Sequence, residues 1–173
     1  RGRVCLDPAD PAKREFQDCF DVKSKRICGP KMVVIPKGRF LMGSSDAEID
    51  ALIKQYPKTN ASWFRWEAPK HEVTIGQPFA AGLTHVTRGE FRAFVTATGH
   101  KLDGGWAYDG KEWKLDSQRN WLSPGFEQDD SHPVVCVNWE DAQAYAAWVK
   151  RETGQPYRLL TEAEAEYMAR GMT

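Results

Sequence analysis

The chain has 173 residues, enough for one ordinary globular domain, and 24 Lys and Arg residues balance 24 Asp and Glu residues to a formal net charge of zero. Without a basic surplus, neither nucleic acid nor an anionic membrane is expected as the main partner. No apolar run approaches the roughly 18 residues of a spanning helix, so no membrane span is expected.

Residues 1–30 carry turn signals and little periodicity, which predicts a cysteine-containing irregular arm or linker before a domain at residues 31–173. The spacing of the cysteines in this arm fits no zinc-binding pattern. A disulfide between the closest pair is favoured because it closes the shortest loop, and three free thiols are the alternative. A disulfide implies an oxidising compartment, so a periplasmic or secreted protein is expected. The disulfide candidates are Cys5, Cys19 and Cys28.

The next segment predicts a hairpin followed by a helix. Two short apolar runs, Met32–Ile35 and Arg39–Met42, flank a Pro-Lys-Gly turn. Ser45–Glu48 is a capping box, and apolar residues at helical spacing follow it until Pro57 ends the helix. Residues 60–66 contain two Trp and one Phe and are expected to form a loop.

The middle of the chain predicts two strands, a helix and a second hairpin. His71–Ile75 alternates in polarity, and Phe79–Val86 follows as another strand. Thr87–Glu90 is a capping box for a helix that Gly99 ends. Residues 106–115 contain an Asp-Gly turn between aromatic runs, which is typical of a hairpin.

The last part of the chain predicts strand, helix, strand and helix. Val134–Val137 is β-branched and apolar, and Asn138 can cap the helix that follows. Gly154 supplies a left-handed exit, and Thr161–Glu164 is a capping box for the final helix. Cys136 lies within the predicted strand and is interpreted as a small core residue, because a buried thiol has a raised pKa and is inert. The whole predicts an α+β fold rich in loops.

Two groups of polar residues are candidates for a chemical site. The histidines do not stand in pairs at metal-ligand spacing, and His71 and His132 are interpreted as side chains that bond the backbone near strands. The glutamates of the last helix are interpreted as favourable charges at a helix start, with general acid–base work as the alternative. These glutamates are Glu162, Glu164 and Glu166.

Aromatic residues between positions 63 and 121 lie in loop and hairpin segments, not on periodic apolar faces. Aromatic side chains bring contact area at low entropic cost, so these residues are candidates for surface recognition. The alternative is that a loop-rich fold uses them as its core. The recognition candidates are Trp63, Trp66, Trp106, Trp113 and Trp121.

Five short blocks stand in a fixed order between about residue 31 and the end of the chain. They are Met32–Ser44, Pro69–Val73, Val86–Thr87, His132–Val135 and Tyr157–Gly171. In this order they resemble the formylglycine-generating enzyme (sulfatase-modifying factor) family. The sequence departs from the family pattern at Leu160, where Pro is usual, at Ala165, where Trp is usual, and at Cys136, where a small residue is common.

The resemblance implies a loop-rich fold related to C-type lectins, with little regular secondary structure. It implies copper-dependent oxidation, by O2, of a sulfatase cysteine to formylglycine. In the family the catalytic cysteine pair and the calcium sites lie in the C-terminal part of the domain, which is expected to be missing from these 173 residues. We therefore expect no catalytic, cofactor-binding or metal-binding residue in this chain, with copper and calcium bound by the missing half. That half and a protein or peptide ligand are the expected partners.

Two alternatives to an oxidase remain open. A non-catalytic ligand-binding or protein-binding module of the same fold is favoured by the departures at Leu160 and Ala165 and by the aromatic loops. The branch of the family that forms C–S bonds needs an iron-binding helical domain, of which the sequence gives no sign. A pair of cysteines in the downstream sequence would distinguish the oxidase from the binding module.

Overall fold

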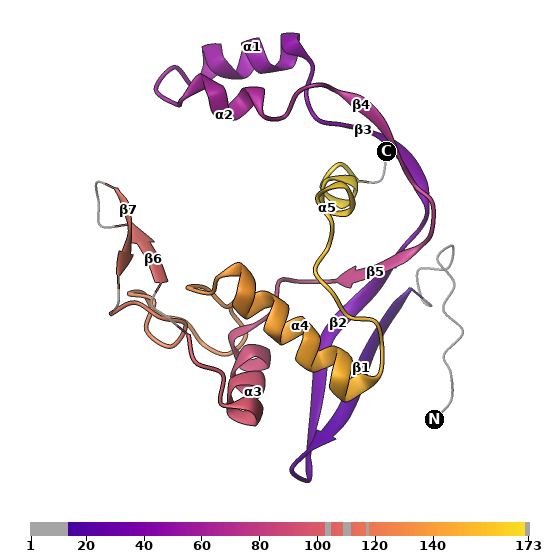
Figure 1. Cartoon of the computed structure of the whole chain (residues 1–173), viewed down its shortest axis with the longest axis vertical. Coiled ribbons are helices and arrows are strands. Elements are labelled where there is room, and N and C mark those ends of the chain that lie inside the picture. The colour runs from indigo at the N-terminus through magenta and orange to yellow at the C-terminus, as the bar shows by residue number, and fades with distance from the viewer. Residues whose placement is uncertain (1–13, 103–104, 109–111, 117, 172–173) are drawn as a thin grey trace. The chain divides into compact units, whose positions relative to one another are not determined.

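The computed structural model of the chain describes residues 14–102, 105–108, 112–116 and 118–171. The elements mix short helices and short strands, as expected for the α+β class. In chain order they are β1 (Glu15–Val22), β2 (Lys25–Ile35), β3 (Gly38–Met42), α1 (Asp46–Gln55), α2 (Ala61–Arg65), β4 (His71–Ile75), β5 (Phe79–Gly82), α3 (Arg88–Thr98), β6 (Gly105–Tyr108), β7 (Trp113–Asp116), α4 (Trp139–Thr153) and α5 (Glu162–Ala169) (Figure 1).

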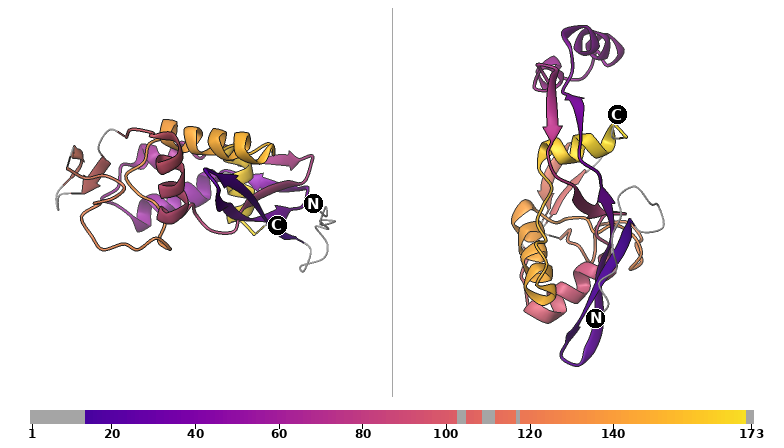
Figure 2. Two further views of the ribbon diagram at one scale, coloured as in Figure 1. Left: turned by 90° about the horizontal axis from the view of Figure 1, so that it is seen from below. Right: turned by 90° about the vertical axis from the view of Figure 1, so that its right-hand side faces the viewer.

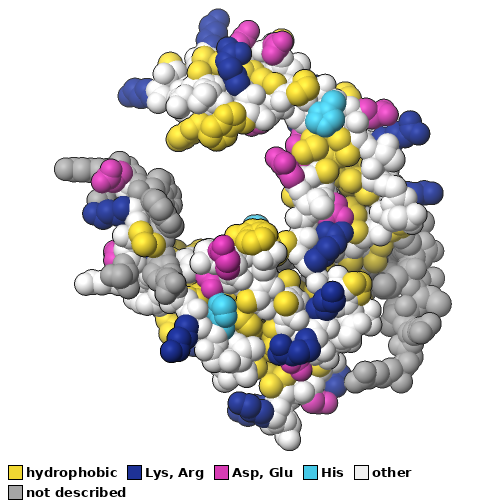
Figure 3. Space-filling view, viewed as in Figure 1, with side chains coloured by type: hydrophobic (Ala, Val, Ile, Leu, Met, Phe, Trp, Pro, Cys, Tyr) yellow, Lys and Arg dark blue, Asp and Glu magenta, His cyan; other side chains and the backbone are white. Residues whose placement is uncertain are grey.

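The chain divides into two compact units. The first contains residues up to Val34 together with Ala80–Leu159, and the second contains Ile35–Phe79 together with the residues from Leu160 onward. Each unit is therefore built from segments that are distant in sequence. None of the described helices is long and apolar enough to cross a bilayer. On the face drawn in Figure 3, Lys and Arg side chains are interspersed with Asp and Glu side chains.

The first unit contains a three-stranded sheet in the order β1-β2-β5. β1 and β2 form an antiparallel hairpin over much of the region expected to be irregular, so that expectation is wrong for residues 15–30. The alternating polarity that is typical of a strand is hard to recognise in β1, because the charged Asp18 occupies a position on its partly buried face. The hydroxyl of Tyr157 donates to the Asp18 carboxylate at 3.0 Å, which lets this charge lie on a partly buried face.

Helices α3 and α4 enclose the core of the first unit together with β1 (Figure 1 and Figure 2). The ring of Phe20 meets Trp148 edge to face, with the ring centroids 5.3 Å apart. Phe91 and Phe94 of α3 form a similar pair at 5.3 Å. Aromatic pairs of this geometry stabilise a core beyond the area that they bury. The buried cluster is Phe20, Phe91, Phe94, Trp121, Tyr145, Trp148 and Val149.

The second unit is built on the antiparallel pair β3–β4, in which Phe40 lies opposite Val73. Helix α5 packs on β3, and the rings of Phe40 and Tyr167 lie 5.3 Å apart. Gly38 permits this packing, because a Cβ atom there would collide with the Tyr167 hydroxyl. Helices α1 and α2 contact one another in the same unit. The β2–β3 hairpin expected from the sequence does not form, since β2 pairs with β1 and β5 while β3 pairs with β4.

The predicted helix starts are confirmed. Ser45, Thr87, Asn138 and Thr161 each cap a helix with both bonds of a capping box. Gly99 and Gly154 end α3 and α4 in the left-handed conformation, with φ of 69° and 70°. These features depend on residues close in sequence, which explains why they could be predicted.

Four predicted segments differ from the structure. Val134–Val137 forms no strand, since Cys136 adopts φ of 55° and only Val134 N–H bonds a neighbouring backbone, at Val86 O. The strand expected at Phe79–Val86 ends at Gly82, and no strand separates α4 from α5. The loop expected at residues 60–66 contains the short helix α2, which the Asn60 side chain caps by accepting from Ser62 N–H at 3.0 Å.

Candidate functional site

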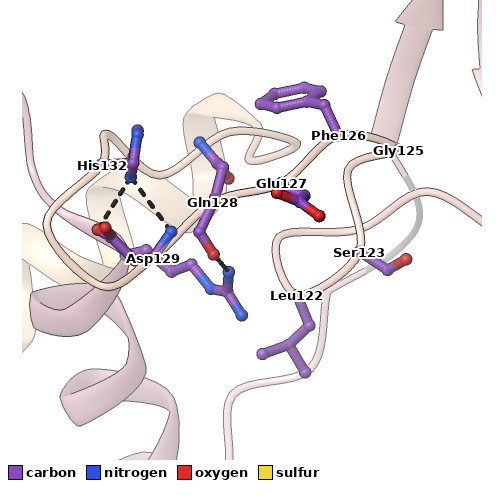
Figure 4. Close-up of a pocket in the computed structure, with 9 residues that line it drawn as sticks. Leu122, Ser123, Gly125, Phe126, Glu127, Gln128, Asp129 and His132 are labelled. Atoms are coloured by element: carbon purple, nitrogen blue, oxygen red, sulfur yellow. Dashed lines mark hydrogen bonds and ion pairs between the residues drawn. The ribbon is translucent and has the colours of Figure 1, made fainter.

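A pocket of about 870 Å³ opens in the first unit, mostly within the loop that precedes α4. The sequence of this loop has neither the helical nor the strand pattern of apolar residues. Figure 4 shows the pocket with its lining side chains. The pocket is lined by Arg88, Leu122, Ser123, Gly125, Phe126, Glu127, Gln128, Asp129 and His132.

The first turn of α3 anchors the far end of this loop. The backbone N–H of Arg88 donates to His132 O at 2.8 Å, and the N–H of Gly89 donates to Asp130 O at 3.0 Å. A helix start leaves N–H groups without helical partners, and the loop carbonyls satisfy two of them. Gly89 permits the approach, because a Cβ atom there would lie 3.0 Å from Asp130 O and 3.1 Å from Asp130 Cβ. The pocket wall is thus fixed by backbone bonds.

Two arginines of α3 hold the loop through their side chains. The Arg88 guanidinium donates to the backbone oxygen of Gln128, and its side chain is only 16% exposed. Arg92 donates to the Asp130 carboxylate at 2.8 Å and lies over the ring of Trp121, 5.5 Å from its centroid. The hydrogen bond from Arg92 holds the pKa of Asp130 below its usual value. Arg88 Nε and Gln128 Oε1 are shielded from solvent, and neither has a hydrogen-bond partner among the described residues.

Asp129 organises the turn beside His132. Its carboxylate accepts from the N–H and hydroxyl of Ser131 at 2.8 and 2.6 Å, and it lies 2.9 Å from His132 Nδ1 (Figure 4). The Ser131 bonds and the His132 contact hold the pKa of Asp129 well below its usual value. Asp129 is therefore an anion at neutral pH whose hydrogen-bonding capacity is largely used within the loop.

The side chains that a ligand could reach in the pocket are Leu122, Phe126 and Glu127. Phe126 is 59% exposed and Leu122 is 48% exposed, which leaves apolar surface at the pocket. Within the described part of the chain, the carboxylate of Glu127 has no hydrogen bond or ion pair, although it is exposed. This arrangement suits binding, since an exposed apolar surface beside an unpaired charge can hold a ligand that carries both features.

The structure confirms the preferred disulfide. Cys19 and Cys28 lie opposite each other in the β1–β2 pair and are bonded. Cys5 lies outside the described residues. Cys136 is a free thiol of intermediate burial, and burial raises its pKa. A raised pKa lowers the thiolate fraction, which disfavours a nucleophilic role for Cys136.

The tryptophans proposed for recognition fall into different environments. Trp63 and Trp66 are 57% and 78% exposed at α2 of the second unit. Trp121 is 6% exposed and belongs to the core of the first unit, so the surface prediction is wrong for it. Two neighbours bury Trp121. The Phe91 ring centroid lies 5.6 Å from the Trp121 ring centroid, and the Arg92 guanidinium carbon lies 5.5 Å from it. The side chains of Trp106 and Trp113 lie outside the described part of the structure.

The histidines and glutamates singled out in the sequence have structural partners. His71 Nδ1 lies 2.8 Å from Pro69 O, as expected for a histidine that fixes a strand start. Glu164 completes the cap of α5 by accepting from Thr161 N–H at 2.9 Å. Glu166 accepts from Gly43 N–H at 2.8 Å and therefore does more than favour the helix start. His71, Glu164 and Glu166 do not line the pocket, whereas His132 does.

Metal coordination by protein side chains needs several ligand groups close together. No group of three or more His, Cys, Asp or Glu side chains among the described residues is placed to hold a metal ion. No chemical step of these residues is therefore assigned to the copper or calcium that the family resemblance implies.

Comparison with known proteins gives a consistent result. The sequence profile of the "Sulfatase-modifying factor enzyme 1-like domain" matches residues 19–173. A "Formylglycine-generating enzyme" of Streptomyces coelicolor is 34% identical over 165 residues, covering 80% of this chain and 46% of that protein. A mouse (Mus musculus) protein named "Inactive C-alpha-formylglycine-generating enzyme 2" is 33% identical over 169 residues, covering 82% of this chain and 48% of that protein.

A solved structure extends the likeness to the fold. PvdO from Pseudomonas aeruginosa superposes with a TM-score of 0.63 at 39% sequence identity, covering 82% of this chain and 48% of PvdO. The chain spans about half the length of the curated relatives that it matches. The relatives include proteins named as enzymes and proteins named as inactive, so similarity to them does not by itself decide catalysis.

Proposed function

The chain belongs to the sulfatase-modifying-factor family, and from this premise we propose that the protein containing it oxidises a peptidyl cysteine of a sulfatase to formylglycine. The observation that carries the proposal is the match of residues 19–173 to the family together with 34% identity to a formylglycine-generating enzyme. The likeness to PvdO at 39% identity supports the same fold for the described residues.

Within this proposal the present chain has a binding and positioning role. Its disulfide removes Cys19 and Cys28 as reactive thiols, and burial raises the pKa of Cys136. We therefore assign the oxidising residues to sequence beyond these 173 residues, where copper and calcium are also proposed to bind. The pocket of the first unit, held by Arg88 and Arg92, is proposed to contact the polypeptide that carries the cysteine.

The test uses the complete protein encoded by the gene, purified and supplied with copper, O2 and a thiol as two-electron reductant, so that the cysteine and O2 give the aldehyde, sulfide and water. A sulfatase-derived peptide with one cysteine is the substrate, and the same peptide with serine in that position is the control. The expected product is an aldehyde that reacts with an aminooxy probe and has the mass expected for replacement of –CH2SH by –CHO. A cysteine peptide recovered without aldehyde, from protein shown to hold copper, would contradict the proposal.

A second function is favoured by one observation. The mouse relative named as inactive is 33% identical, nearly as similar as the enzyme of Streptomyces coelicolor. A non-catalytic module that binds a polypeptide through the same surface is therefore the alternative. Saturable peptide binding by the complete protein, with no aldehyde formed, would select this alternative.

The cellular location follows from the disulfide. A bonded Cys19–Cys28 pair is typical of proteins that fold in an oxidising compartment, so we propose a periplasmic or secreted protein. Alkylation of free thiols in intact cells, followed by non-reducing mass spectrometry, measures whether this pair is oxidised in the native host. A reduced pair in freshly trapped cells would contradict the proposed location.

A further inference from the structure

The second unit contains a stretch in which cations and aromatic side chains are concentrated. Residues 51–66 include the last turns of α1, the connection that follows it and α2, and they contain no Asp or Glu. In a chain with equal numbers of acidic and basic residues, this separation is a local feature that the net charge conceals. The basic aromatic segment, as we call it, consists of the cations Lys54, Lys58 and Arg65 and the aromatic residues Tyr56, Trp63, Phe64 and Trp66.

The aromatic side chains of the basic aromatic segment are largely open to solvent. Tyr56 is 49% exposed, Trp63 57% and Trp66 78%. Trp63 lies in α2 and Trp66 is the C-cap residue of that helix, so the two are neighbours on the helix surface. The ring centroids of Tyr56 and Phe64 lie 6.3 Å apart, which brings the end of α1 against α2. Exposed apolar surface that is grouped in this way marks an interaction site.

The cations of the basic aromatic segment are accessible to a partner. Lys54 and Lys58 are exposed, and neither has an ion pair within the described part of the chain. Arg65 lies 3.8 Å from the Asp50 carboxylate, and an ion pair between two largely exposed side chains is weak. On the face drawn in Figure 3, basic and hydrophobic side chains lie close together over α1 and α2.

The other acidic groups nearby do not cancel this positive charge. Glu48 forms an ion pair of 2.7 Å with Lys70, and the Glu67 carboxylate accepts a hydrogen bond of 2.7 Å from the Ser44 hydroxyl. Asp46 begins α1, and at 1.5 Å per residue it lies about 12 Å along the helix axis from the first cation of the segment. This separation exceeds the Debye length of about 8 Å at physiological ionic strength.

We infer that the basic aromatic segment is a peripheral binding surface for an anionic lipid bilayer. Lys54 and Lys58 pair with anionic headgroups, while Trp63 and Trp66 lie between headgroups and acyl chains, where tryptophan is enriched. A soluble acidic polymer would pair with the cations but leave the tryptophans in water, so a bilayer accounts for both features. A neutral chain can make this contact, because the potential of a charged surface acts only within about a Debye length.

The experiment is co-sedimentation of the complete protein with lipid vesicles. One set of vesicles contains equal parts of phosphatidylcholine and phosphatidylglycerol, and the other contains phosphatidylcholine alone. Each accessible cation near an anionic surface contributes about fivefold to partitioning, so we expect about tenfold or stronger partitioning into the anionic vesicles. This excess is expected to fall as salt is raised, since the surface charge is screened.

A pair of double variants tests the charge. Lys54→Gln with Lys58→Gln is expected to lower partitioning into the anionic vesicles by about tenfold. Lys23→Gln with Lys25→Gln is the matched control, because it removes the same charge at the exposed turn between β1 and β2, and it is expected to have little effect. The Tm of each variant is measured alongside, and it should be unchanged because all four side chains are exposed.

A second pair of variants tests the aromatic contact. Trp66→Ala is expected to lower partitioning by about fivefold or more, because less apolar surface leaves water at the bilayer. Trp139→Ala is the matched control, since Trp139 is 61% exposed at the first residue of α4 in the first unit, and it is expected to partition like the wild type.

Equal partitioning into the two kinds of vesicle, or partitioning into neither, would overturn the inference. Anionic partitioning that survives Lys54→Gln with Lys58→Gln would place the contact elsewhere in the complete protein and would overturn it as well. Soluble poly-glutamate that displaces the protein from vesicles at equal charge concentration would assign the surface to an acidic polypeptide instead. Because no aldehyde is measured, failure of this inference and failure of the oxidase proposal are separate results.

Discussion

The backbone N–H of Gly43 donates a hydrogen bond of 2.8 Å to the carboxylate of Glu166, which lies 123 residues later in the chain. Arg170 completes the contact by donating to Glu166 at 2.7 Å and to the backbone oxygen of Gly43 at 2.8 Å. Both polar backbone groups of Gly43 are thus bonded by α5 and the residue that follows it. This contact gives a physical reason for the joint presence of the Met-Gly-Ser block and the Glu-Tyr-Met-Ala-Arg block.

Removing the carboxylate should destabilise the fold. Glu166→Ala leaves the buried Gly43 N–H without its acceptor and removes the bond between Arg170 and Glu166, so we expect a loss of about 1–3 kcal/mol in the free energy of unfolding. Chemical denaturation of the complete protein measures it. Glu162→Ala, in the same helix but exposed, should cost no more than about 1 kcal/mol through the helix dipole. Equal losses in the two variants would contradict the assigned role of Glu166.

The same contact predicts a pH dependence. Although burial opposes it, the bonds from Gly43 and Arg170 hold the pKa of Glu166 below its usual value of 4.5. A carboxyl with a lowered pKa in the folded state stabilises the fold above its unfolded pKa, and the contribution is lost as pH falls through the folded pKa. The stability difference between the wild-type protein and Glu166→Gln should therefore be largest near neutral pH and shrink below about 4.5. A difference that grows with acid would have the wrong sign.

Gly43 itself should not tolerate a side chain. Its φ is 81°, and a Cβ atom would collide with the backbone oxygen of Glu67. Left-handed strain and overpacking together predict that Gly43→Ala lowers the free energy of unfolding by about 2–5 kcal/mol. Gly76→Ala is the matched control, because nothing lies within 4 Å of the added atom. Thermal melts of the two variants should separate clearly, and similar Tm values would show that the tight backbone approach at Gly43 is absent in solution.

The disulfide should contribute measurably to stability. Cys19 and Cys28 are 9 residues apart, and the entropy of closing a loop of this length predicts about 2–3 kcal/mol. Replacing both by Ser should lower Tm and abolish the effect of a reductant on the melt. Cys136→Ser should leave the effect of the reductant unchanged, since Cys136 is a free thiol. If reductant still lowered the Tm of the double variant, another cysteine pairing would be responsible.

The sequence predicted what depends on near neighbours. Ser45 and Thr87 cap helices because each has a glutamate three residues later, and Gly99 and Gly154 end helices because glycine tolerates positive φ. The disulfide was predictable for the same reason, since Cys19 and Cys28 lie opposite each other in a hairpin closed by a short turn.

Features that depend on distant segments were predicted poorly. The segments Met32–Ile35 and Arg39–Met42 resemble two arms of a hairpin in the sequence. In the structure the first pairs with β1 and β5, and the second pairs with β4. Trp121 occurs in an aperiodic loop, which hides the contacts with Phe91 and Arg92 that bury it.

The pocket was missed because its loop has no periodicity. One local signal was available in the sequence, the run Gln128-Asp129-Asp130-Ser131, which is rich in residues that bond nearby backbone. What makes this run a pocket wall is the first turn of α3, about forty residues earlier, through Gly89 and Arg92. No pattern in a single sequence joins those two segments.

The separation of Gly43 from its partners also bears on the timing of synthesis. Arg170, which bonds the Gly43 carbonyl, follows it by 127 residues. At a translation rate of about 5–20 residues per second, Gly43 leaves the ribosome about 6–25 s before Arg170 can reach it. During this interval the Phe40 ring, on which Tyr167 of α5 later packs, is open to other chains, and a chaperone that binds extended apolar segments would find its target there.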